Sequence, residues 1–172
     1  KYVYQPAPMY SADVSVSGGS TGVRYYLSGG ALSQEGLRMG SSYKKAFGRI
    51  NLDANLADWA KANVNTQVSY ADTRVSPFGN NNAVGGGLAA MNAPFASPYD
   101  PNTGLELERV PLLDLATPKH VISTNPAKTN AFILSANGNL TLTPIKNLTV
   151  RSLVGLELNY GDSRSRTLPS YY

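Results

Sequence analysis

The chain has 172 residues, of which 42% are hydrophobic and only 15% charged, whereas about a quarter is charged in a typical soluble domain. The net charge of +4 comes from scattered basic residues, which excludes the concentrated basic surface of a nucleic-acid-binding protein. The sequence contains no cysteine, so disulfides and thiolate metal sites are excluded. No apolar run approaches the roughly 18 residues of a membrane-spanning helix.

The first predicted strands lie near residues 11–17 and 23–33. Apolar and polar side chains alternate in both segments, as in a strand whose successive side chains point to opposite faces of a sheet. The glycine-rich residues 18–22 between them are typical of a turn. We expect a hairpin here, with a bend or bulge at Gly29-Gly30.

The second predicted hairpin is the clearest. Its strands lie near 43–56 and 60–72, and residues 57–59 leave room only for a tight turn. Small and aliphatic residues occupy every second position and end at Tyr70, with Phe47 as the one exception to the alternation. The intervening positions carry charged and amide side chains, so one face of the hairpin is apolar and the other is polar.

The third predicted hairpin pairs residues 130–143 with 148–160. The same alternation runs through both strands, and Tyr160 falls on the apolar side. Pro144 cannot donate a hydrogen bond to a neighbouring strand, so we place a turn at 144–147. A long loop at 73–128 separates this hairpin from the preceding one.

These six strands predict an all-β fold, namely the wall of an antiparallel transmembrane β-barrel with long extracellular loops. Several strands exceed the 9–11 residues that cross a bilayer at a tilt. Short turns alternate with longer connections, as in outer-membrane barrels with periplasmic turns and external loops. Because such barrels start at eight strands, we expect residues 1–172 to form part of a larger barrel, with no plug domain of their own.

Aromatic residues mark the ends of the predicted spanning region. Tyr70 and Tyr160 lie on the apolar face near the long-loop ends of their strands. An aromatic girdle occupies this level in outer-membrane barrels. Ordinary cross-strand packing is the alternative explanation for these tyrosines.

Several segments resemble SusC-type TonB-dependent transporters of Bacteroidota (the RagA/SusC family). They are VSVSGG at 14–19, RYYLSGG at 24–30, QEG at 34–36, YKK at 43–45, RINLD at 49–53, ASPYDP at 96–101, NY at 159–160 and SRSRT at 163–167. The resemblance extends from about Tyr10 to Tyr172. It rests on the order and spacing of the segments rather than on a single motif.

The resemblance implies a location in the outer membrane of a Gram-negative bacterium and a role in nutrient uptake. The family builds 22-stranded barrels around an N-terminal plug and imports oligosaccharides or peptides with energy delivered by TonB. Its partners are a SusD-like surface lipoprotein, outer-membrane lipids, the glycan or peptide substrate and the TonB complex. The plug and the TonB-binding segment have no counterpart in this chain.

The functional residues that we expect fall into two groups. The polar face of the second hairpin provides residues that would line the lumen or touch a plug: Lys45, Arg49, Asn51, Asp53, Lys61, Asn63, Asn65 and Gln67. A purely structural, solvated wall is the alternative for this face. Tyr99 and Asp100 in the long loop are candidates for external contacts, because loops of this length are often functional.

No residue pattern predicts an enzyme, a cofactor or a metal site. His120 is the only histidine, and no partner is spaced to form a triad or a metal site with it, so we expect a surface residue. Asp100 to Gly104 predicts a turn rather than a calcium loop. We expect Glu106 and Glu108 to be solvated rather than an acid/base pair.

Two other functions compete with a transporter segment. A passive porin or a structural outer-membrane protein would share the barrel but lack a plug and coupling to TonB. A soluble carbohydrate-binding β-sandwich would have strands nearer six residues long and would not need detergent.

Overall fold

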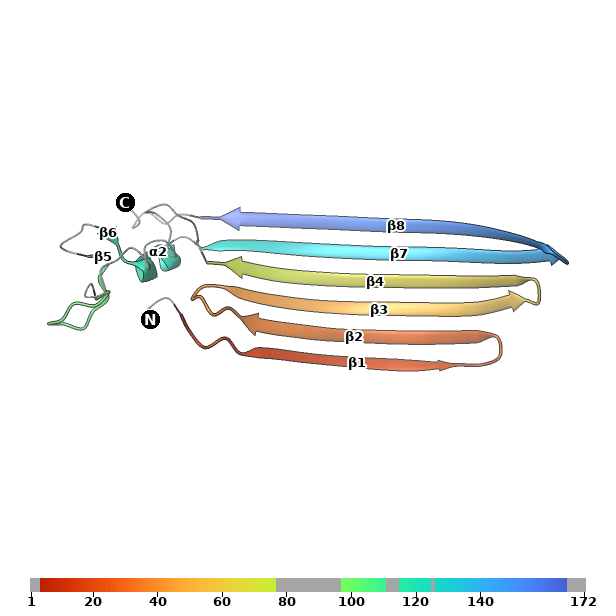
Figure 1. Cartoon of the computed structure of the whole chain (residues 1–172), viewed down its shortest axis with the longest axis horizontal. Coiled ribbons are helices and arrows are strands. Elements are labelled where there is room, and N and C mark those ends of the chain that lie inside the picture. Colours follow the sequence, from red (N-terminus) through yellow and green to blue (C-terminus); the bar gives the residue numbers. More distant parts are fainter. Residues whose placement is uncertain (1–3, 77–96, 111–114, 125, 167–172) are drawn as a thin grey trace.

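The computed structural model describes residues 4–76, 97–110, 115–124 and 126–166. Six antiparallel strands form one sheet in the order β1-β2-β3-β4-β7-β8 (Figure 1). Their bounds are Met9–Gly19 for β1, Val23–Glu35 for β2, Ser42–Ala57 for β3, Ala60–Val75 for β4, Ala127–Ile145 for β7 and Leu148–Ser165 for β8. Shorter elements gather at one end of the sheet: β5 (Arg109–Val110), β6 (Leu115–Ala116) and helix α2 (Pro118–Thr124).

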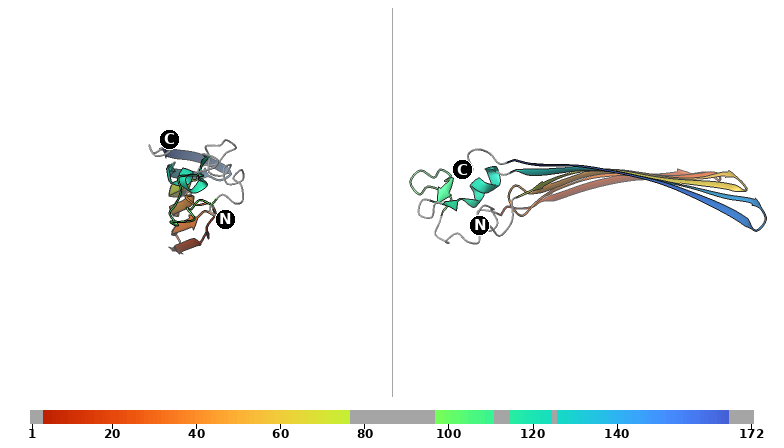
Figure 2. Two further views of the ribbon diagram at one scale, coloured as in Figure 1. Left: turned by 90° about the vertical axis from the view of Figure 1, so that its left-hand side faces the viewer. Right: turned by 90° about the horizontal axis from the view of Figure 1, so that it is seen from above.

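The sheet confirms the predicted fold class of a long-stranded antiparallel barrel wall. Its six strands contain 11 to 19 residues, so each reaches or exceeds the length needed to cross a bilayer at a tilt. All three hairpin turns lie at one end of the sheet, and the longer connections lie at the other (Figure 1). Figure 2 shows a thin, twisted layer that bends along its length. β4 and β7 extend into the predicted loop 73–128, of which residues 77–96, 111–114 and 125 lie outside the described part of the chain.

The turn between β7 and β8 is tighter than expected. Strand β7 continues through Ile145 and β8 begins at Leu148, so only Lys146 and Asn147 form the turn. Asn147 adopts a positive φ of 70°, which asparagine tolerates better than most residues. Pro144 therefore lies within β7, where the register shifts between Leu142 and Ile145. This irregularity accommodates a residue that cannot donate to the neighbouring strand.

The predicted bulge at Gly29-Gly30 is wrong. Both glycines pair in regular register with β1 and β3. Instead, the ring of Phe47 lies over Gly30, and a Cβ atom there would come within 2.8 Å of its Cζ atom. This close approach explains why residue 30 is a glycine, since a larger side chain would collide with the ring. It also explains why the aromatic Phe47 interrupts the polar positions of β3, because its ring can cover β2 only where no side chain intervenes.

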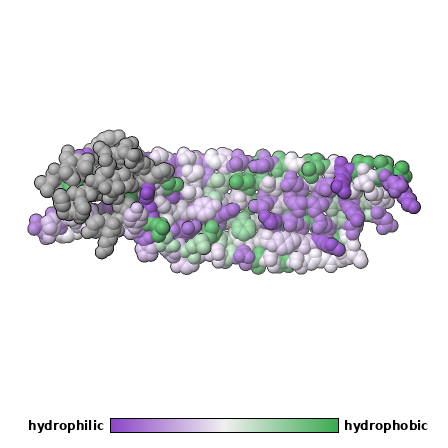
Figure 3. Space-filling model, viewed as in Figure 1, coloured by the Kyte–Doolittle hydropathy of each residue, from purple (hydrophilic) through white to green (hydrophobic). Residues whose placement is uncertain are grey.

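The register divides the sheet into two faces. The apolar face contains even-numbered positions of β1, β3, β4, β7 and β8 and odd-numbered positions of β2, and the polar face contains the others. Figure 3 shows a face on which hydrophilic residues predominate from the middle of the sheet to the hairpin-turn end. On the apolar face the aliphatic side chains are exposed, with 51% exposure for Ile50 and 71% for Val154. Nothing in the described structure covers this apolar surface.

An aromatic row crosses the apolar face near its long-loop end. Tyr70 pairs with Phe132, and Phe132 pairs with Tyr160 on β8. The next paired positions toward the loops are polar, with Asp72 opposite Asn130 and Asn130 opposite Asp162. The face thus changes from aliphatic to aromatic to polar along the strands.

The elements at the long-loop end form the small buried core of the described structure. Val110 and Val121 are buried there, and Ile122 of α2 lies against Gly40 in the β2–β3 connection. His120 is only 9% exposed, so the expectation of a surface histidine is wrong. The backbone N–H of His120 donates to Thr117 Oγ1, which caps the helix. In the described ranges, no helix combines the length and apolar character needed to span a membrane.

Candidate functional site

The polar face gathers the predicted site residues because antiparallel pairing places equivalent positions of neighbouring strands side by side. On β3 and β4, Arg49 pairs with Gln67, Asn51 with Asn65, and Asp53 with Asn63. Lys61 pairs with Asn55 at the hairpin-turn end. Lys45 lies apart from the others toward the long-loop end, where it pairs with Ala71.

Hydrogen bonds link these polar side chains across the strands. Arg49 Nη2 donates to Gln67 Oε1 at 2.9 Å. Asn63 Nδ2 donates to Asp53 Oδ1, and Asn65 Nδ2 donates to Asn63 Oδ1 at 2.7 Å. Five of the predicted residues therefore form two separate hydrogen-bonded groups, which restrain side chains that are otherwise open to solvent.

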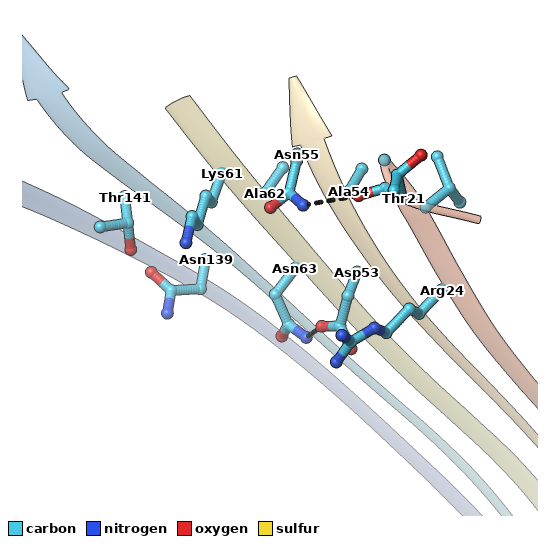
Figure 4. Close-up of a pocket in the computed structure, with 12 residues that line it drawn as sticks. Thr21, Arg24, Asp53, Ala54, Asn55, Lys61, Ala62, Asn63, Asn139 and Thr141 are labelled. Carbon is cyan, nitrogen blue, oxygen red and sulfur yellow. Dashed lines mark hydrogen bonds between the residues drawn. The ribbon is translucent and has the colours of Figure 1, made fainter. Parts of the chain in front are cut away.

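A hollow of about 370 Å³ lies at the hairpin-turn end of this network (Figure 4). Arg24, Asp53 and Asn63 lie together on one side, whereas Lys61 lies further along β4 and Asn139 lies on β7. Asn55 Nδ2 donates to the backbone oxygen of Thr21 at 3.2 Å, which ties β3 to the first turn. The hollow thus offers both cationic and amide groups to a polar ligand or a packed polypeptide.

A second, shallower hollow of about 230 Å³ follows toward the middle of the sheet. The residues that line it are Arg49, Asn51, Asn65, Thr66, Gln67, Ser135 and Asn137. Together the two hollows contain seven of the eight predicted residues of the polar face.

The register also adds residues that were not selected as site candidates. Arg24 pairs with Asp53, while Asn137, Asn139 and Thr141 of β7 pair with Asn65, Asn63 and Lys61. Their alternation was visible in the sequence, but only the strand order places β7 beside β4 across more than fifty intervening residues. The candidate surface therefore extends over four strands rather than one hairpin.

The loop candidates Tyr99 and Asp100 lie in a small folded unit. Asp100 Oδ1 accepts the backbone N–H of Asn102 at 2.7 Å, and the Gly104 N–H donates to the Asp100 carbonyl at 2.8 Å. The N–H from Asn102 stabilises the carboxylate and lowers the pKa of Asp100 below its usual value. Asp100 thus organises a turn, as the sequence predicts.

Lys119 connects this loop to helix α2. Its Nζ atom lies 2.6 Å from Glu106 Oε2, 3.2 Å from Tyr99 Oη and 5.2 Å from the centroid of the Tyr99 ring. The hydrogen bond to Glu106 is the main cause of the raised pKa of Lys119. Glu106 is exposed to solvent, as the sequence predicts, and it also forms this ion pair.

Metal-binding side chains do not gather in the part of the chain that the structure describes. In the described segments, no group of three or more His, Cys, Asp or Glu residues is placed to hold a metal ion. The polar face offers hydrogen-bond donors, acceptors and both signs of charge, which suit binding and selection rather than bond cleavage.

Comparison with known proteins places this geometry in a family. No family model matches the chain. It is 40% identical over 79 residues to TonB-dependent receptor P26 of Formosa agariphila, an alignment that covers 46% of this chain and 8% of the relative. Solved structures of the RagAB peptide importer in closed-closed and open-open states match 97% of this chain at 26% identity, with TM-scores of 0.82 and 0.83. The chain is thus similar to a barrel segment of a SusC-like TonB-dependent receptor.

The chain spans only a small part of the proteins that it matches. It covers 19% of the matched chain in both RagAB structures. Within that part, the structural match includes nearly the whole sheet together with its long-loop end. The polar network and the exposed apolar face are consequently features of a barrel wall, with an inner and an outer surface.

Proposed function

We propose that the intact protein containing this chain is an outer-membrane active transporter that depends on TonB and imports peptides or oligosaccharides. The match to a peptide importer over 97% of the chain carries this proposal. The likeness to a TonB-dependent receptor in Formosa agariphila supports it independently. The chain contributes a section of the barrel wall and performs no catalytic step.

The proposed orientation follows from the two faces. The apolar face contacts lipid, because its exposed aliphatic residues would otherwise face water across four or more strands. The polar face lines the lumen, where charged and amide residues tune selectivity or contact a plug. The hairpin turns then lie in the periplasm and the folded loop unit lies outside the cell.

The polar network gives the lumen wall a defined chemistry. Arg24, Arg49 and Lys61 present cations, while the amides of Asn51 and Gln67 both donate and accept hydrogen bonds. Peptide backbones and sugar hydroxyls need this mixture of donors and acceptors. We also propose a SusD-like surface lipoprotein as the partner at the long-loop end, where Tyr99 and Asp100 lie.

The soluble sandwich is not supported, because the strands greatly exceed six residues and the described chain forms one large sheet with a bare apolar face. A passive porin shares the barrel, but no observation favours it over the importer. Uptake distinguishes the two, since only active transport requires TonB and the proton gradient.

The decisive experiment measures uptake of fluorescent oligopeptides and oligosaccharides by cells that carry or lack the gene. Import of at least one substrate class is expected to stop when the gene, TonB or the proton gradient is removed. Uptake that persists without TonB but still requires the gene would show a passive porin instead.

A further inference from the structure

Small residues form a narrow groove along the apolar face. On β2 and β3, Gly29 lies opposite Gly48 and Ala31 lies opposite Ala46. Beside this floor the same face carries Val68 and Tyr70 on β4, and Tyr10, Ala12 and Val14 on β1. The floor therefore lies between larger side chains except beside Ala12, and the paired Leu27 and Ile50 end it toward the hairpin turns.

Two hollows occupy this channel in succession. The hollow nearer the loops measures about 610 Å³ and lies between Tyr10 and Tyr70, over Ala31 and Ala46. The second measures about 370 Å³ and contains residues of the glycine floor, Val14 and Val68. From Lys44 to Gly48 the channel follows four residue steps of β3, or about 13 Å at 3.3 Å per residue.

The loop end of the channel carries positive charge. Lys44 lies opposite Asp72, and Arg74 occupies the next position of this face on β4. Lys128 Nζ lies 2.6 Å from Asp72 Oδ2, so that carboxylate already has a cationic partner. Lys44 and Arg74 are exposed, and no ion pair joins either of them to another described residue.

We propose that this groove binds one acyl chain of an outer-leaflet lipid, while Lys44 and Arg74 contact the phosphate of its headgroup. The proposal rests on the proposed membrane orientation, which puts the long-loop end outside. Half of a hydrocarbon core measures about 15 Å, so the groove has the depth of one leaflet with its cations at headgroup level. A cationic end on an otherwise apolar channel matches an anionic lipid better than a second protein copy.

The test uses the intact receptor, stripped of lipid in detergent and analysed by native mass spectrometry. The probes are dimyristoylphosphatidylglycerol, whose headgroup is anionic, and dimyristoylphosphatidylcholine, whose headgroup is zwitterionic. We expect one tightly held lipid per barrel at the groove, with a preference for phosphatidylglycerol. Lys44→Gln should reduce that preference about fivefold.

The groove floor is tested with Ala46→Leu, which should weaken binding of both lipids because its larger side chain occupies the channel. Matched controls are Arg151→Gln on the polar face of β8 and Ala136→Leu on the apolar face of β7, neither of which should change lipid binding. If the Ala46→Leu receptor fails to assemble, the Lys44→Gln receptor still tests the proposal, because Lys44 is exposed and its replacement leaves the groove floor unchanged.

Lipid binding that is unchanged in both groove variants would overturn the proposal. A receptor dimer that dissociates on Ala46→Leu while lipid retention stays constant would also overturn it, since the occupant would be a second copy. Uptake assays on the same variants distinguish failure of the lipid site from failure of the proposed function. A receptor that still imports substrate through TonB but binds no lipid in the groove contradicts the lipid site alone.

Discussion

Lys119 shows how a single side chain holds a loop in place. It joins the hairpin that contains Tyr99 and Glu106 to helix α2 by an ion pair, a hydrogen bond and a cation–π contact. Because the pKa of Lys119 is raised, its stabilising contribution is present below the ordinary value of 10.5 and is lost as pH rises through the folded value. The contact is therefore fully charged at neutral pH.

Replacing Lys119 should loosen the loop unit without affecting the sheet. In Lys119→Met, backbone amides of residues 97–110 are expected to exchange hydrogen faster at pH 7, while those of β3 and β4 keep their protection. Hydrogen exchange followed by mass spectrometry on the intact receptor measures this, with Lys61→Met as the control cation. Unchanged exchange in the loop would show that the contacts of Lys119 are incidental.

At the scale of the strand, the glycines differ in whether a neighbouring side chain or backbone atom leaves room for a Cβ atom. A Cβ at Gly30 would lie 2.8 Å from Phe47 Cζ and 2.9 Å from the backbone oxygen of Ala12. A Cβ at Gly138 would meet no heavy atom within 4 Å. The two glycines therefore have different structural roles although both lie within strands.

Gly30→Ala should destabilise the barrel by about 1–3 kcal/mol, because the ring and the backbone must move apart. Gly138→Ala should change stability by less than this. Urea unfolding of the intact receptor in lipid vesicles measures the difference. Equal effects of the two substitutions would contradict the proposed packing of Phe47 over Gly30.

The period of two was sufficient to predict the sheet, its two faces and seven residues that line the hollows, because side-chain alternation is local. It could not reveal the extension of the polar site to Asn139 and Thr141, since pairing of β4 with β7 is not local. The burial of His120 depends on packing at the long-loop end, which has no periodic signal. The misplaced bulge at Gly29-Gly30 arose because glycine also permits close packing in regular strands.

At the scale of the whole molecule, the sheet lacks the core that would stabilise it in water. Its apolar face is exposed, and its outer strands β1 and β8 have one unpaired edge each in the described structure. A lipid environment and pairing with further strands of a barrel satisfy both requirements. A sheet placed in this way should tolerate an added charge on its polar face but not on its apolar face.

An arginine scan tests this asymmetry. Ile50→Arg and Val64→Arg, on the apolar face, should destabilise the assembled receptor by about 2–4 kcal/mol if they lie near the bilayer midplane. Asn51→Arg, one position away on the polar face, should be tolerated. The amount of heat-resistant, folded receptor in outer-membrane fractions reports the effect.

The most direct test of the orientation measures what each face of β3 touches. Single spin labels are introduced from Gly48 to Ala54 in the intact receptor within lipid vesicles, and collisions with oxygen and with a water-soluble nickel complex are recorded. We expect collisions with oxygen, which dissolves in lipid, to dominate at even positions such as Ile50 and Leu52. Collisions with the nickel complex, which stays in water, should dominate at odd positions such as Asn51 and Asp53. The same accessibility at both sets of positions, or the reverse pattern, would contradict a barrel wall with its apolar face in lipid.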